Sequence, residues 1–198
     1  MLIIQIIGLC VMAYLLGSIS FALLGAKIFG FSDPRKAGSK NPGATNVLRL
    51  GGKKAAIFVL MGDLLKGIFP VILAKFLGIP LFFQGIIALI AVLGHIFPVY
   101  YGFKGGKGVA STLGILCALN LALGLAASLT WLLVAFVFRY SSLASLVMAV
   151  SLPGYAHWLK LTPLLPSLFL LTGMLVLCHR ANIKRLILGK ENKIGAKS

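Results

Sequence analysis

Four short polar stretches hold nearly all the side chains of this sequence that could do chemistry. Each combines lysine or arginine with neutral hydrogen-bonding residues, and long apolar runs separate the four. Such a mixture suits the binding of phosphate and hydroxyl groups. The chain has only three acidic residues: Asp33, Asp63 and Glu191. Two-metal phosphate chemistry and a carboxylate acid–base pair are therefore disfavoured, because both need carboxylates in clusters.

The first polar stretch, residues 37–49, surrounds an Asn-Pro-Gly turn. Its neutral donors and acceptors suit hydroxyl groups: Ser39, Asn41, Thr45 and Asn46. Arg49 follows within a helical turn, and its planar guanidinium suits bidentate binding of phosphate. The alternative is a surface turn in which asparagine and threonine cap a helix and Arg49 meets lipid headgroups. A polar cluster this dense beside apolar runs favours a functional stretch.

The second stretch, residues 104–108, reads Lys-Gly-Gly-Lys-Gly and precedes a predicted helix. Glycines let backbone N–H groups turn toward an anion, and the two lysines add charge, so the pattern predicts a phosphate cradle. It is not a Walker A loop, because only three residues separate Gly102 from Gly106, where that motif needs four. The alternative is a flexible turn between helices that carries lysines for topological reasons.

The remaining two stretches lie in the second half of the chain. Ser142 begins an apolar run after Arg139, where it either caps a helix or belongs to a site. No acidic residue completes a Ser-His-Asp triad, which disfavours a nucleophilic serine. His179 and Asn182 end the last apolar run and would share one face if the helix continues.

Three ionisable residues lie within or beside apolar runs. Asp63 and Lys66 stand i, i+3 apart, and we expect a mutual salt bridge because isolated charges inside a membrane are costly. His95 ends another run, and we expect a hydrogen-bonded structural residue there; contact with a loop or with substrate is the alternative. The three cysteines show no metal-ligand spacing and are expected to be small apolar residues.

The apolar runs that position these stretches predict membrane helices. The chain is 60% hydrophobic and 11% charged, which excludes an ordinary soluble domain. Its net charge of +16 flanks the apolar runs, a pattern typical of membrane proteins and not of nucleic-acid binding. We predict membrane spans near residues 3–26, 55–76, 80–100, 142–159 and 163–179. The run 109–138 is long for one span and short for two.

Charge parity resolves the ambiguous run. Basic residues cluster in the connection after the first span and again in the tail, as Arg180, Lys184, Arg185, Lys190, Lys193 and Lys197. Positive residues favour the cytoplasm, so an even number of spans must separate the two regions. The run 109–138 then forms two short helices, with a turn near Asn120–Gly124. We predict a single all-α domain over residues 1–198 with seven spans, an outer N-terminus and a cytoplasmic C-terminus.

Taken together, the polar motifs resemble one known family. The motifs are Gly38-Ser39-x-Asn41-Pro42-Gly43-Ala44-Thr45-Asn46 with Arg49, Gly94-His95-x-Phe97-Pro98, Lys104-Gly105-Gly106-Lys107-Gly108, Tyr140-Ser141-Ser142 and His179-x-x-Asn182. They are similar to those of the bacterial acyl-phosphate-dependent glycerol-3-phosphate acyltransferases, from about residue 14 to about residue 195. One departure is Lys40, where a glycine is common.

The resemblance implies transfer of a fatty acyl group from acyl phosphate to the 1-hydroxyl of glycerol 3-phosphate. It places the enzyme in the bacterial inner membrane with a cytoplasmic site, without cofactor, metal or nucleic-acid partner. The candidate catalytic residues are Ser39, Arg49, Lys104, Ser142, His179 and Asn182. The candidate substrate-binding residues are Asn41, Thr45, Asn46, Gly105, Gly106, Lys107, Gly108 and Lys184. His95 and Glu191 are expected to be structural residues near the site.

Several alternatives stay open at the level of the sequence. The residues alone also fit a membrane carrier for organic phosphates, which needs buried cations as well. The general base is either a phosphate oxygen of the substrate or His179. Acyl-chain preference, the order of substrate binding and oligomeric state are not indicated.

Overall fold

A computed structural model describes residues 1–195 of the chain; residues 196–198, which include Lys197 of the basic tail, lie outside the described part. Within residues 1–195 the regular structure is entirely helical, which confirms the all-α prediction. The helices are α1 (Leu2–Gly17), α2 (Phe21–Phe29), α3 (Ala44–Phe76), α4 (Leu81–Ile96), α5 (Val109–Leu119), α6 (Leu121–Phe138), α7 (Ser141–Trp158), α8 (Leu165–Cys178) and α9 (Arg180–Ile187). Two short 3₁₀ turns, Val99–Tyr101 and Thr162–Leu164, interrupt the connections.

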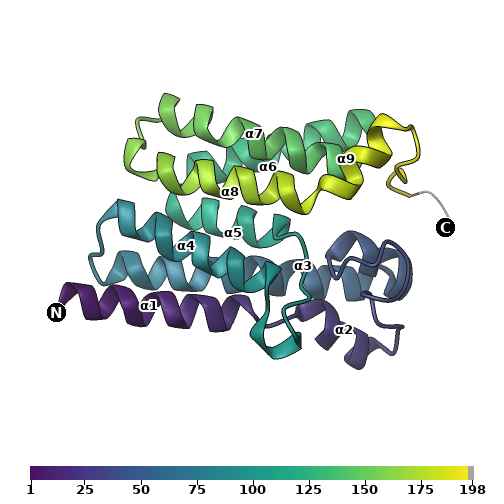
Figure 1. Ribbon diagram of the computed structural model, residues 1–198, viewed down its shortest axis with the longest axis horizontal. Coiled ribbons are helices and arrows are strands. Elements are labelled where there is room, and N and C mark those ends of the chain that lie inside the picture. Colours follow the sequence, from purple (N-terminus) through teal and green to yellow (C-terminus); the bar gives the residue numbers. More distant parts are fainter. Residues whose placement is uncertain (196–198) are drawn as a thin grey trace.

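The long helices lie roughly parallel to one another as a bundle (Figure 1). α1 packs against α4, α3 against α5, and α6 against α7, which in turn contacts α8. Small residues allow the closest of these approaches. A Cβ atom at Gly17 would collide with the backbone of α4, and one at Gly94 would collide with the backbone of α1. Small residues at helix crossings are typical of membrane bundles, because they let backbones come into van der Waals contact.

In the described part of the chain, four segments are long and apolar enough to cross a membrane: Leu2–Phe29, Ala44–Phe76, Leu81–Tyr101 and Leu121–Phe138. A fifth is possible if Thr162–Cys178 and Arg180–Ile187 form one span bent by 59°. Large apolar side chains point outward from these helices, as for Phe136, which is 85% exposed. Such a surface suits lipid and not water. The count of seven spans and their orientation stay predictions. α5 has 11 residues, fewer than a membrane span needs, and the helices alone do not show which end of the bundle faces the cytoplasm.

The first predicted span, 3–26, is not one continuous helix. α1 ends at Gly17 and α2 begins at Phe21. The Ser18 hydroxyl donates to the Tyr14 carbonyl at 2.8 Å, and the Ser20 hydroxyl caps α2 by accepting from the Leu23 N–H at 3.4 Å. Serine is a favoured N-cap residue, so a new helix starts here. Averaged hydropathy concealed the break because two serines barely change the mean.

The run 109–138 does form two helices. α5 has 11 residues and α6 has 18, and they meet at Asn120. The Asn120 side chain accepts a hydrogen bond from the Leu123 N–H at 3.0 Å and so caps α6. The turn falls at the beginning of the predicted range, Asn120–Gly124.

α3 begins at Ala44, inside the long connection between the first two predicted spans, 3–26 and 55–76. It consists of two helical parts that meet at Gly52, whose φ of 76° and ψ of −174° are not helical. Glycine adopts a positive φ without steric cost, so the chain can bend here. The bend leaves Thr45, Asn46 and Arg49 on a short helical segment at the end of the bundle.

Candidate active site

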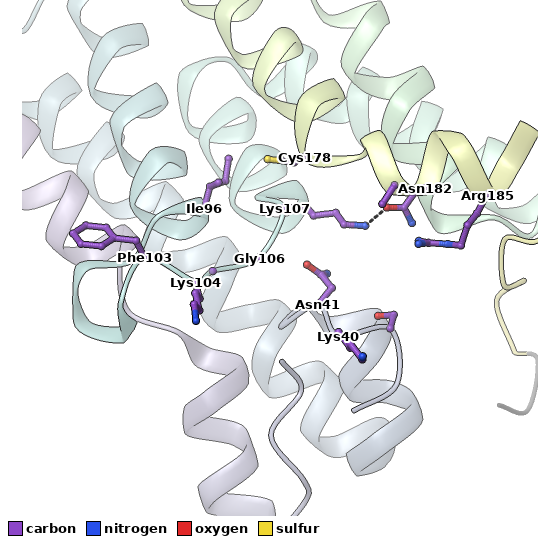
Figure 2. Close-up of a pocket in the computed structure, with 13 residues that line it drawn as sticks. Lys40, Asn41, Ile96, Phe103, Lys104, Gly106, Lys107, Cys178, Asn182 and Arg185 are labelled. Atoms are coloured by element: carbon purple, nitrogen blue, oxygen red, sulfur yellow. Dashed lines mark hydrogen bonds between the residues drawn. The ribbon is translucent and has the colours of Figure 1, made fainter. Parts of the chain in front are cut away.

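A pocket of about 330 Å³ opens at the end of the bundle where three of the four polar stretches meet (Figure 2). Its volume lies near the lower limit for small-molecule sites, roughly 300 Å³. The lining residues are Ser39, Lys40, Asn41, Ile96, Phe103, Lys104, Gly105, Gly106, Lys107, Cys178, Ala181, Asn182 and Arg185. Four of these residues are basic and none is acidic, so the pocket favours an anionic ligand.

The pocket contains half of the predicted site residues. Seven of them line it: Ser39, Asn41, Lys104, Gly105, Gly106, Lys107 and Asn182. Two basic residues that we had not selected, Lys40 and Arg185, line it as well. In the sequence, Lys40 is marked as a departure from the resembling family and Arg185 as one basic residue of the tail. Figure 2 shows Ile96, Phe103 and Cys178 on one side of the pocket and Asn182 with Arg185 on the other.

A short series of hydrogen bonds joins Lys107 to the first turn of α9 and to the tail that follows α9. Its Nζ donates to Asn182 Oδ1 at 2.5 Å, and Asn182 Nδ2 donates to Glu191 Oε1 at 2.6 Å. The same Glu191 carboxylate accepts from Ser142 Oγ at 2.7 Å and from Arg185 Nε at 2.7 Å. Glu191 thus ties residues of α7, α9 and the tail together beside the pocket.

Lys107 and Glu191, the charged residues of this hydrogen-bonded series, both have shifted pKa values. Burial lowers the pKa of the Lys107 ammonium to about 8, although the nearby Glu191 carboxylate acts in the opposite direction. Burial alone would raise the pKa of Glu191, but the hydrogen bonds from Asn182, Ser142 and Arg185 hold it below its ordinary value. Lys107 can therefore lose its charge at a pH not far above neutral.

The glycine-rich stretch turns two of its N–H groups away from the pocket. The Gly105 N–H donates to the Ile96 carbonyl and the Gly106 N–H to the His95 carbonyl, each at 3.2 Å. The predicted backbone cradle therefore cannot use these two groups. The glycines have a different local reason: a Cβ atom at Gly105 would collide with the His95 carbonyl oxygen, and one at Gly106 with the His95 ring.

Asn46 does not line the pocket but fixes the loop that does. Its amide nitrogen donates to the carbonyls of Pro34 at 3.0 Å and Ala37 at 3.1 Å. Its amide oxygen accepts from the Ser39 N–H at 2.9 Å. Asn46 is buried, so this geometry supports the positioning of Ser39 and not direct contact with substrate.

Six other candidates lie outside the pocket lining. Thr45 Oγ1 lies 3.4 Å from Ser141 Oγ, and Arg49 Nη2 donates to the Lys193 carbonyl at 3.4 Å. His179 is only 2% exposed, and its Nδ1 lies 2.7 Å from the Leu175 carbonyl, to which it must donate. The other three candidates are Ser142, in the hydrogen-bonded series above, Gly108 at the start of α5, and Lys184, exposed on α9.

Two residues of the lining have unusual backbone conformations. Lys40 has a φ of 57° and Phe103 a φ of 59°, in the left-handed region that favours glycine. Backbone strain of this kind concentrates at functional sites. The Lys40 position is also where the sequence departs from the resembling family, which commonly has glycine there.

An all-helical bundle with long apolar helices and a cationic pocket at one end is the architecture of an integral membrane protein with a site suited to an anionic ligand. Residues 7–189 match the family described as glycerol-3-phosphate acyltransferase. The chain belongs to this family.

Named relatives and solved structures agree with this assignment. A glycerol-3-phosphate acyltransferase of Burkholderia cenocepacia is 49% identical, over 98% of this chain and 92% of the relative. One of Burkholderia lata is 50% identical over the same shares. The crystal structure of PlsY (YgiH), an integral membrane glycerol 3-phosphate acyltransferase, superposes in its glycerol 3-phosphate form with a TM-score of 0.91 at 39% identity, over 96% of each chain. Its lysophosphatidic acid form gives 0.88 at 38% identity and the same coverage.

Proposed function

We propose that this chain transfers a fatty acyl group from acyl phosphate to the 1-hydroxyl of glycerol 3-phosphate. The products are lysophosphatidic acid and inorganic phosphate. The observation that carries the proposal is the pocket lining, in which Lys40, Lys104, Lys107 and Arg185 meet without a carboxylate. Both substrates carry phosphate, and a cationic site offsets their mutual repulsion.

The chemical step needs positioning more than it needs a nucleophilic side chain. Acyl phosphate is already an activated electrophile, so the glycerol hydroxyl attacks its carbonyl carbon directly and phosphate leaves. No covalent enzyme intermediate forms. Holding two substrates together and stabilising the developing oxyanion supply the acceleration. Lys104 and Lys107 suit the phosphates, while Ser39, Asn41 and Asn182 offer hydrogen bonds to hydroxyl groups.

We assign the role of general base to a phosphate oxygen of the substrate. His179 is buried and lies outside the pocket lining, which supports this choice. The alternative is His179 itself. A His179→Ala variant that keeps most of its turnover and an unchanged pH profile would remove His179 as base. If His179→Ala instead lost one limb of the pH–rate profile, His179 would be the general base.

We also propose that the pocket faces the cytoplasm from a bacterial inner membrane. The pocket end of the bundle carries the basic stretches, and positive residues favour the cytoplasmic side. The start of α1 and the end of α9 lie at opposite ends of the bundle, which fits an odd number of spans (Figure 1).

Product formation by the purified protein in lipid tests the proposal. Glycerol 3-phosphate is supplied with acyl phosphate, or in parallel with an acyl thioester, in the presence of a metal chelator. Lysophosphatidic acid from acyl phosphate alone is the expected result. Turnover only with the thioester would keep the acyltransferase class but contradict the donor. Binding of glycerol 3-phosphate without any product would favour a carrier.

A further inference from the structure

A buried ion pair inside α3 has no part in the proposed reaction. Lys66 Nζ lies 2.7 Å from Asp63 Oδ1, and each side chain is only 3% exposed. This is the salt bridge that the spacing predicted. Removing two charges from water costs free energy that their mutual attraction does not always recover. Ionisable residues at such depth are usually functional, so the pair calls for a role beyond stability.

The pair connects α3 to the break between α1 and α2 and to α4, and through His95 to α5. Lys66 Nζ donates to the Ile19 carbonyl at 2.7 Å, in the break between α1 and α2. Asp63 Oδ1 lies 3.5 Å from His95 Nδ1, at the end of α4. His95 Nδ1 also lies 3.3 Å from Ser111 Oγ of α5. The aspartate therefore faces the one histidine that borders the glycine-rich stretch.

His95 in turn holds that stretch by its backbone and by its ring. Its carbonyl accepts the Gly106 N–H at 3.2 Å, and the neighbouring Ile96 carbonyl accepts the Gly105 N–H at the same distance. Its ring lies so close to Gly106 that a Cβ atom there would collide with Nε2. The next residue along the chain, Lys107, extends into the pocket toward Asn182 (Figure 2).

We propose that Asp63 is a positioning residue for glycerol 3-phosphate binding, acting through His95 on the glycine-rich stretch. The Asp63 carboxylate on the Nδ1 side orients the imidazole of His95. The opposite edge of the ring, at Nε2, then packs against Gly106. This support holds Lys107 in its place in the pocket. The ammonium group of Lys66 neutralises the buried negative charge of the Asp63 carboxylate. A carboxylate that orients a histidine is a common arrangement in functional sites. The inference rests on the proposed function, since it assumes that Lys107 meets a substrate phosphate.

The Asp63→Asn variant tests the inference by steady-state kinetics in lipid. An amide cannot orient the imidazole as a carboxylate does, so the stretch loses its fixed position. We expect KM for glycerol 3-phosphate to rise about tenfold, while kcat stays within about twofold of wild type. A global loss of structure would instead lower kcat with the amount of folded protein and leave KM unchanged.

The double variant Asp63→Asn, Lys66→Met separates positioning from charge balance. It removes both buried charges, so it should regain the thermal stability that the single variant loses. If Asp63 positions the stretch, KM stays raised, because the carboxylate beside His95 is still missing. A return of KM to the wild-type value would show that the pair is only structural and would overturn the inference. This variant also decides the matter if Asp63→Asn does not fold.

Tyr155→Phe is the matched control, because it breaks the 2.7 Å hydrogen bond between Tyr155 of α7 and Thr130 of α6, both outside the pocket lining. KM for glycerol 3-phosphate should stay within about twofold of the wild-type value.

Different results would contradict the inference and the proposed function. A wild-type protein that makes no lysophosphatidic acid contradicts the function. A wild-type protein that turns over, with an unchanged KM in folded Asp63→Asn, contradicts only the positioning role.

Discussion

Among the residues of the pocket, Lys107 combines burial with a direct contact to Asn182. Its pKa of about 8 follows from burial, with the Arg185 guanidinium acting in the same direction and Glu191 against both. Below pH 8 Lys107 is charged and attracts phosphate, and above pH 8 it becomes neutral. Its charge at physiological pH therefore depends on a small free-energy difference.

The pH dependence of KM should reveal this titration. Bound phosphate stabilises the charged lysine, so the free enzyme titrates and KM for glycerol 3-phosphate rises above pH 8. The rise should reach roughly tenfold about one unit above the pKa. In Lys107→Arg the guanidinium stays charged over this range, so KM should vary little with pH. A parallel rise in both proteins would exclude Lys107 as the titrating group.

At the scale of elements, the tail after α9 closes over the first turn of α7. The Ile194 N–H donates to the Arg139 carbonyl at 2.6 Å, and Arg139 Nη2 donates back to the Ile194 carbonyl at 3.2 Å. Glu191 adds its hydrogen bonds to Ser142, Asn182 and Arg185. The position of Asn182 in the pocket thus depends on a segment outside any helix.

Glu191→Gln should loosen this closure. The amide has one acceptor where the carboxylate had two, and its NH₂ group faces donors, so a buried donor is left without a partner. We expect the melting temperature in lipid to fall by about 5 °C and the turnover to fall with it. Asp33→Asn is the control, because it breaks only the partly exposed ion pair with Arg35, and it should change the melting temperature little.

Glu191 should stabilise the folded protein at neutral pH and lose this effect in acid. Its pKa is lowered in the folded protein, so its contribution is complete above the ordinary glutamate pKa and is lost as the pH falls through the lowered value. The difference in melting temperature between wild type and Glu191→Gln should therefore shrink on acidification. A difference that stays constant down to pH 3 would contradict the assignment.

At the scale of the whole molecule, the predicted topology places the connection at Lys160 outside the membrane and the tail at Lys193 in the cytoplasm. Lys160 and Lys193 are both exposed and belong to opposite predicted sides of the membrane. In a background without native cysteines, a membrane-impermeant maleimide added to intact cells should label Lys160→Cys and not Lys193→Cys. Permeabilised cells should show labelling of both. Labelling of both in intact cells, or of Lys193→Cys alone, would refute the predicted orientation.

Particular residues show how far reasoning from the sequence extends. Lys107 and Asn182 were selected from separate stretches, and the structure joins them by a hydrogen bond. Lys40 is marked by the sequence only as a departure from the family, and Arg185 only as part of the basic tail, although both line the pocket. Asn46 was assigned to substrate, but its amide groups are used by the backbone of residues 34–39. A side chain's partners cannot be read from its type when they come from another part of the chain.

The sequence by itself determined the helical membrane class and the cationic, carboxylate-poor composition of the polar stretches. Hydropathy and charge are summed over local segments, so they do not depend on how the segments pack. Only the tertiary structure decided which polar residues share the pocket and that Asp63 faces His95. These facts depend on close approaches between residues far apart in the sequence, and such approaches are set by the packing of the helices.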